Sequence, residues 1–115
     1  MLAYLVADLM WGSKIASAAQ AAGRPARRVR SWDDTRSLLE QGTVRLVLVD
    51  LTDPAAGEIV AQTPVVAGSG GRVIAFGPHV DTEAFERARA CGAEVLPRGA
   101  LIRRLDEIMG TQPGG

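Results

Sequence analysis

Short runs of strand-forming residues alternate along this chain with longer stretches in which apolar residues recur at helical spacing. The runs predict five strands, at residues 2–7, 27–30, 44–49, 72–76 and 94–96. The stretches between and after them predict helices at 13–22, around Leu38 and Leu39, in a short segment after Pro54, at 82–91 and at 100–109.

Capping and helix-breaking residues suggest where these helices begin and end. Asp33 or Asp34 is the expected N-cap of the second helix, and Asp81 or Thr82 that of the fourth. Pro54 is expected to start the third helix, and the glycine cluster at 68–71 leaves it room for about two turns. The third helix is therefore the weakest element of the pattern.

Five strand–helix units in succession predict an α/β fold. Connections between neighbouring parallel strands are right-handed, so the helices should cover both faces of a doubly wound, five-stranded parallel sheet. We expect residues 1–110 to form a single domain and 111–115 a disordered tail.

The most apolar run, at residues 46–49, ends on Asp50, and Pro54 follows four residues later. Such a run, bounded by turn-forming residues, is typical of a central strand that is buried on both faces. Open parallel sheets bind ligands beyond the carboxyl ends of their strands. Asp50 is therefore the first candidate for a functional residue.

Charge and cysteine content narrow the range of functions. The 115 residues include 13 basic and 13 acidic ones, which removes the electrostatic case for a nucleic-acid or anionic-membrane partner. One cysteine, Cys91, and one histidine, His79, are too few for a structural zinc site. The first ten residues contain Asp8 and lack a basic leader, so we expect a cytoplasmic protein.

The end of the third predicted strand resembles that of the receiver (CheY-like) domain of bacterial two-component response regulators, and the likeness extends over essentially the whole chain. In receivers Pro follows the phosphoacceptor Asp by four residues, as Pro54 follows Asp50. Asp8 matches the second of the two acidic residues that hold Mg²⁺ in that family. The resemblance implies a flavodoxin-like sheet with strand order 2-1-3-4-5, a phosphoacceptor at Asp50 and Mg²⁺ bound by Asp8 and Asp50.

Several positions depart from the receiver pattern. Ala7 stands where a first metal-binding carboxylate is expected, and Gly77 where a Ser or Thr hydroxyl bonds the phosphoryl group. Arg98 followed by Gly99 replaces Lys followed by Pro, and a planar guanidinium does not reproduce an ammonium group. Val95 replaces the aromatic residue that reports switching.

These departures predict a pseudo-receiver. Losing one preorganised donor costs an enzyme about 3 kcal/mol, or about 100-fold in rate, and here a donor and a metal ligand are both absent. We therefore expect a stand-alone, non-catalytic signalling module that binds a partner protein, without enzyme activity and without a cofactor other than weakly held Mg²⁺.

Three other interpretations of the same residues remain open. In the first, Asp50 is phosphorylated in the presence of Mg²⁺. In the second, Asp50 is structural: it caps the following turn and pairs with Arg98, which replaces the metal as its counterion. In the third, the edge that carries Asp8, Trp11, Asp50, His79 and Arg98 binds a small ligand.

Two surfaces are candidates for contact with partners. Trp11 and Trp32 follow the first and second strands and are expected to form an apolar rim beside Asp8, near Gly77 and His79. In receivers the fourth helix, fifth strand and fifth helix commonly form a symmetric dimer face. The resemblance therefore implies a homodimer through a mixed-charge surface that includes Arg87, Glu94, Arg103 and Asp106.

Overall fold

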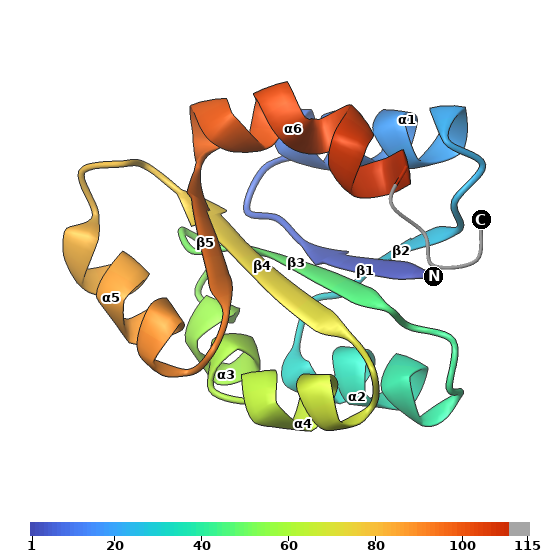
Figure 1. Cartoon of the computed structure of the whole chain (residues 1–115), viewed down its shortest axis with the longest axis horizontal. Helices are drawn as coiled ribbons and strands as arrows, with labels where there is room; N and C mark the ends of the chain where they lie inside the picture. The colour runs from blue at the N-terminus through green and yellow to red at the C-terminus, as the bar shows by residue number, and fades with distance from the viewer. Residues whose placement is uncertain (111–115) are drawn as a thin grey trace.

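The structure of the protein is a computed structural model that describes residues 1–110. Five parallel strands form one sheet in the order β2-β1-β3-β4-β5, as predicted (Figure 1). In chain order the strands are β1 (Leu2–Leu5), β2 (Ala26–Arg28), β3 (Leu46–Asp50), β4 (Arg72–Gly77) and β5 (Glu94–Pro97). The predicted tail at 111–115 lies outside the described residues.

Helices cover both faces of this sheet. Helices α1 and α6 lie on one face, and α2, α3, α4 and α5 lie on the other (Figure 1). Their bounds are α1 (Leu9–Ala21), α2 (Trp32–Glu40), α3 (Ala56–Val60), α4 (Thr63–Gly68), α5 (Thr82–Ala90) and α6 (Arg98–Gly110). The predicted doubly wound α/β fold is therefore confirmed.

The central strand β3 is completely buried, and its side chains divide between two apolar clusters. Leu46 and Leu48 pack with side chains of α1 and α6, whereas Val47 and Val49 pack with those of α2, α3, α4 and α5. Successive side chains of a strand point to opposite faces. One apolar run thus anchors both helical layers, and each buried aliphatic side chain contributes about 1.5–3 kcal/mol.

Helix α1 begins four residues before the predicted start at residue 13. Its N-cap is Asp8, whose carboxylate accepts a hydrogen bond from the Trp11 backbone N–H at 2.9 Å. Strand β1 correspondingly ends at Leu5 rather than at residue 7. At α5 the predicted cap is confirmed, because the Asp81 carboxylate accepts a bond from the Ala84 N–H at 3.3 Å.

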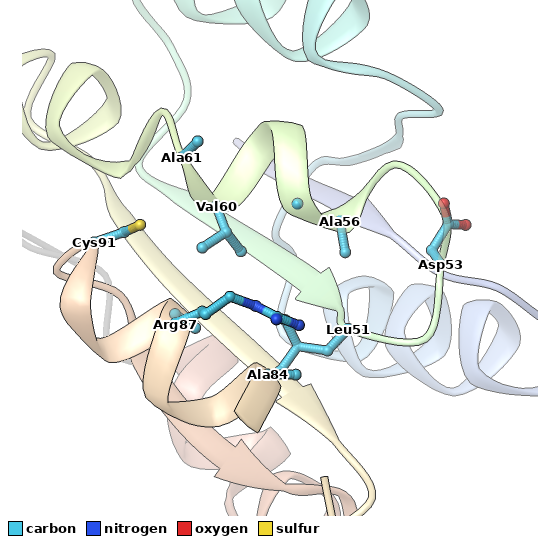
Figure 2. Close-up of a pocket in the computed structure, with 10 residues that line it drawn as sticks. Leu51, Asp53, Ala56, Val60, Ala61, Ala84, Arg87 and Cys91 are labelled. Carbon is cyan, nitrogen blue, oxygen red and sulfur yellow. The ribbon is translucent and has the colours of Figure 1, made fainter. Parts of the chain in front are cut away.

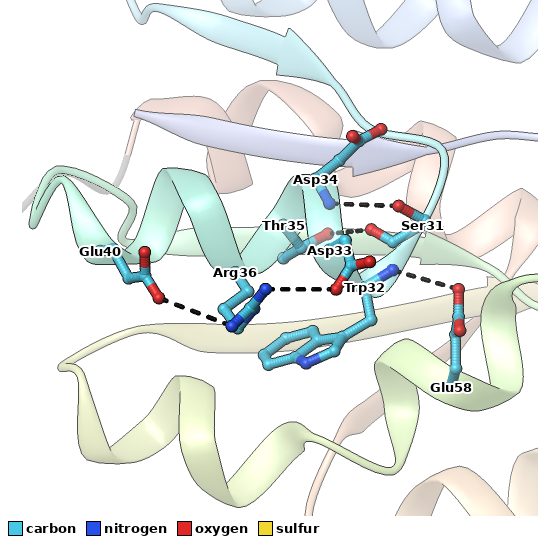
Figure 3. A network of polar contacts seen from close by, with 8 residues as sticks. All are labelled: Ser31, Trp32, Asp33, Asp34, Thr35, Arg36, Glu40 and Glu58. Atoms are coloured by element: carbon cyan, nitrogen blue, oxygen red, sulfur yellow. Dashed lines mark hydrogen bonds and ion pairs between the residues drawn. The ribbon is translucent and has the colours of Figure 1, made fainter.

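The prediction of Asp33 or Asp34 as the N-cap of α2 is wrong, because Ser31 fills that position. The Ser31 hydroxyl accepts a hydrogen bond from the Asp34 N–H at 3.1 Å, as Figure 3 shows. The Asp34 carboxylate lies in the first turn and accepts a bond from the Arg30 N–H at 2.9 Å. Ser31 and Asp34 therefore accept hydrogen bonds from two backbone N–H groups, those of Asp34 and Arg30, in an arrangement similar to a capping box.

The segment after β3 differs most from the prediction. Pro54 does not begin a helix: residues 51–55 form turns, and α3 starts only at Ala56. The region expected to become loop forms a second short helix, α4, with Pro64 in its first turn. Proline is well tolerated there because the first N–H groups of a helix have no partner within it.

None of the helices in the described part of the chain is both long and apolar enough to span a bilayer.

Candidate functional site: the carboxyl end of strand β3

Asp50 is the last residue of β3, and its side chain is completely buried, with 0% exposed. The strand places it between β1 and β4, at the carboxyl edge of the sheet. A buried carboxylate without partners is strongly disfavoured, because ionised groups lose their hydration on burial. The contacts of its two oxygens therefore decide what Asp50 can do.

Both Asp50 oxygens accept hydrogen bonds from the protein. Oδ1 accepts from the Thr52 N–H at 3.0 Å and from the Thr52 hydroxyl at 2.7 Å. Oδ2 accepts from the Ala7 N–H at 3.0 Å. The bonds to Thr52 close an Asx-type turn directly after the strand, and the bond to Ala7 ties the end of β1 to the end of β3. The predicted structural role of Asp50 as a turn cap is therefore present.

Arg98 supplies the positive charge beside Asp50. Its guanidinium Nη2 lies 3.8 Å from Asp50 Oδ1 and donates to the Thr52 hydroxyl at 3.4 Å. The guanidinium carbon also lies 5.7 Å from the centre of the Trp11 ring, within the range of a cation–π contact. The predicted Asp50–Arg98 pair therefore forms, with Arg98 as the first residue of α6.

Thr52 is the member of this site that the sequence analysis missed. Its hydroxyl and backbone N–H both donate to Asp50, and the hydroxyl also accepts a hydrogen bond from Arg98. The available signal was its position two residues after a strand-end Asp, where such side chains commonly bond the backbone.

Asp8 and Ala7 are placed differently from the acidic pair of a receiver. The Asp8 side chain is exposed, and its Oδ1 caps α1. Ala7 presents no carboxylate, and its backbone N–H points at Asp50 Oδ2, where a cation would need an oxygen ligand. Within residues 1–110 no group of three His, Cys, Asp or Glu side chains is arranged to hold a metal ion. The donor set fits the Mg²⁺ site of a receiver poorly.

Gly77 is the last residue of β4, the strand beside β3, and His79 lies in the loop after it. Gly77 is buried, and a Cβ atom there would meet Leu51 Cβ at 3.4 Å, which is ordinary contact. His79 is exposed in the loop that follows, and within residues 1–110 it forms no hydrogen bond or ion pair. The structure thus places both at the predicted edge, and within residues 1–110 neither donates a hydrogen bond to the Asp50 carboxylate.

The two tryptophans do not form the apolar rim predicted beside Asp8. Trp11 is 8% exposed and packs in the α1–α6 layer, with its ring centre 5.5 Å from that of Phe76. Trp32 packs against the cluster on the opposite face of the sheet. Its backbone N–H donates a hydrogen bond to the Glu58 carboxylate at 3.1 Å (Figure 3). The rim prediction is wrong because β1 leads into α1 on one face of the sheet, whereas β2 leads into α2 on the other.

The four residues of the predicted dimer surface point in different directions. Arg87 extends into a groove of about 270 Å³ between α3 and α5, shown in Figure 2. Glu94 pairs with Arg72 at 2.7 Å, and Asp106 borders a groove against α1. Arg103 is exposed on α6. Within residues 1–110 no hydrogen bond or ion pair joins these four side chains to one another, so the dimer surface stays a prediction.

Comparisons with known proteins bear on the fold. No family model matches the sequence, and no curated protein is similar enough in sequence to match it. Solved structures do match. A CheY-like receiver domain protein from Methanospirillum hungatei superposes with a TM-score of 0.73 at 13% identity, covering 94% of this chain and 91% of that one.

Two further solved structures are similar in fold. HP1043, an orphan response regulator of H. pylori, gives a TM-score of 0.69 at 21% identity, over 96% of both chains. NtrX from Brucella abortus gives 0.71 at 13% identity over 94% of this chain, which spans only 27% of that protein. Together with the strand order 2-1-3-4-5, these matches show that the chain has the fold of response regulator receiver (CheY-like) domains.

Proposed function

We propose that this chain is a pseudo-receiver, a signalling module that keeps the receiver fold, does not use Asp50 as a phosphoacceptor and acts by binding another protein. The observation that carries the proposal is the state of Asp50, which is fully buried with hydrogen bonds on both oxygens and a cation at 3.8 Å.

A phosphoacceptor needs a free carboxylate oxygen in line with the phosphorus atom, and charge stabilisation of the transferred group. Freeing an Asp50 oxygen means breaking the bond to Ala7 or the paired bonds to Thr52. Leaving a buried donor unpaired costs about 1–3 kcal/mol for each group. Two further losses disfavour phosphoryl transfer. Ala7 supplies no carboxylate for a metal ion, and Gly77 supplies no hydroxyl for the phosphoryl group.

Exposed apolar side chains at the same edge support a role in binding a protein. Leu9 and Met10, at the start of α1, are 74% and 68% exposed, and Val80, after β4, is 75% exposed. Helix α1 and the loop with Val80 follow β1 and β4, the two strands that flank β3. Large exposed apolar groups are typical of interaction sites when they gather into a patch. The homodimer implied by the resemblance remains part of the proposal, with sedimentation analysis as its test.

Phosphorylation can be tested directly by intact-mass measurement. The wild-type protein is incubated with acetyl phosphate and Mg²⁺, with Asp50→Asn as the control. We expect the mass of the wild type to stay that of the unmodified chain. Addition of one phosphoryl group to the wild type and none to Asp50→Asn would establish the alternative, a response regulator that is phosphorylated on Asp50.

A further inference from the structure

The outer edge of the sheet at β2 carries backbone groups without a partner. The Leu2 N–H bonds to the Pro25 carbonyl, and the Val29 N–H bonds to the Tyr4 carbonyl, both at 2.9 Å. In a parallel pair the bonding residues alternate, so the N–H and C=O groups of Ala26 and Arg28 point away from β1. Within residues 1–110 no other strand pairs with them.

Arginines flank this open edge on both faces of the sheet. Arg27 lies on the side of Val29, which packs in the α2 layer. Arg28 lies on the opposite side, where its Nη2 donates to the Val6 carbonyl at 3.2 Å. Arg30 is exposed just beyond the strand. None of these three guanidinium groups forms an ion pair within residues 1–110.

A polar groove of about 330 Å³ adjoins the edge on the α2 side. Arg27 borders it together with Ser37 and Gln41 of α2. The one acidic side chain at its wall, Asp34, is already bonded to the Arg30 backbone N–H. The groove therefore offers a cation and neutral hydrogen-bonding groups to whatever lies along β2.

We propose that the β2 edge, defined by residues 26–30, binds an extended acidic segment of a partner protein as an added strand. The backbone groups of Ala26 and Arg28 would pair with the segment, and Arg27, Arg28 and Arg30 would meet its carboxylates from both faces. Strand addition to an open edge is an established mode of peptide recognition. This inference rests on the proposed role as a protein-binding module, and it names the class of partner.

Charge distinguishes this occupant from the alternatives. Pairing of two copies through β2 would set the arginines against each other, and like charges on neighbouring strands are destabilising. A nucleic acid would meet the arginines but would leave the N–H and C=O groups of Ala26 and Arg28 without strand partners. A strand of about six residues buries little surface, so the contact belongs to the weak, transient class of interfaces.

The test uses a blocked heptapeptide of four glutamates and three valines as the probe. Binding is followed by NMR titration of the full chain, and edge pairing by amide hydrogen exchange. We expect slower exchange at Ala26 and Arg28 in the presence of the peptide. A peptide of equal charge with proline in place of valine cannot complete the strand ladder, so it should bind at least about tenfold more weakly, a change of about 1.4 kcal/mol.

Two double variants distinguish binding at the β2 edge from attraction by the overall charge of the protein. Arg27→Glu with Arg30→Glu should weaken binding at least about tenfold, whereas Lys14→Glu with Arg45→Glu, at two exposed residues outside the β2 edge, changes the net charge equally and should leave binding within about twofold. Arg27→Gln with Arg30→Gln serves if the first pair does not fold.

Three results would overturn the inference: unchanged exchange at Ala26 and Arg28, equal binding of the proline peptide, or tighter binding of a ten-residue oligothymidylate than of the acidic peptide. None of these outcomes depends on whether Asp50 is phosphorylated, which the phosphorylation assay measures separately.

Discussion

At the scale of single residues, Asp50 is the residue on which the proposed pseudo-receiver function rests. Its carboxylate is a structural acceptor that joins β1, the turn after β3 and the start of α6. The same Asp–Pro spacing that marks a phosphoacceptor in receivers thus also suits a strand-end Asp that caps a turn.

Replacing Asp50 by Asn should destabilise the protein. Both oxygens accept backbone N–H groups, so an amide NH₂ must face one donor, and the charge opposite Arg98 is lost. We expect the free energy of unfolding to fall by about 1–3 kcal/mol, which lowers the Tm by about 4–12 °C for a domain of this size. Thermal unfolding followed by circular dichroism measures this shift. An unchanged or higher Tm would contradict the structural role.

Restoring the receiver residues should restore a response to a phosphoryl mimic. Ala7 is exposed and accommodates a carboxylate, and a Cβ at Gly77 meets only ordinary contacts. The triple variant Ala7→Asp, Gly77→Ser, Arg98→Lys is expected to gain Mg²⁺-dependent stabilisation by beryllium fluoride, which melting curves detect. The same triple variant with Asp50→Asn is the matched control and should gain none. A triple variant that stays unresponsive would show that burial of Asp50 alone prevents binding.

At the scale of elements, the helix ends show what Asp8 does. It is the N-cap of α1, so Asp8→Ala should lower the free energy of unfolding by about 1 kcal/mol, while Asp8→Asn, which preserves a good cap, should change it by a few tenths. Urea unfolding of the two variants checks this. Equal losses in both would show that the charge matters and that the cap does not.

The elements also show how much of the fold and site the sequence predicts. The alternating pattern predicts all five strands, and the buried strand β3 is the clearest because a strand covered on both faces requires an apolar run. The exposed strand β2 has no such run. The sequence does not predict helix α4, because a proline and the glycine cluster at 68–71 are typical of a loop, whereas Pro64 occupies the first turn of a new helix. The partner of Asp50, Thr52, was missed because a two-residue Asx turn leaves no periodic pattern. The prediction of a tryptophan rim is wrong because the position of a strand does not by itself show which face of the sheet the following side chain covers.

At the scale of the whole molecule, the buried side chain of Arg24 connects the segment after α1 to the last turn of α6. Arg24 is 6% exposed, and its Nη1 donates to the Ile108 carbonyl near the end of α6 at 3.2 Å. Its Nε has no hydrogen-bond partner within residues 1–110. Burial, and then the charge of Arg72, lower the pKa of Arg24 from its usual value.

This environment predicts that the aliphatic stem of Arg24 matters more than its charge. Arg24→Met should change the free energy of unfolding by less than about 1 kcal/mol, because it keeps the packing and removes a buried cation that has no carboxylate partner. Arg24→Ala should lower it by about 2–4 kcal/mol, since it leaves a cavity. Chemical denaturation of both variants compares them. Equal losses in Met and Ala would show instead that the bond to Ile108 dominates.

The most direct test of the central claim is the Tm of the wild-type protein with and without Mg²⁺ plus beryllium fluoride. A ligand present at 100 times its Kd would stabilise the fold by about 2.7 kcal/mol, a shift of about 10 °C for a domain of this size. A buried Asp50 with both oxygens bonded predicts no shift. A shift of several degrees in the wild type that is absent in Asp50→Asn would contradict the pseudo-receiver and establish Asp50 as a working phosphoacceptor.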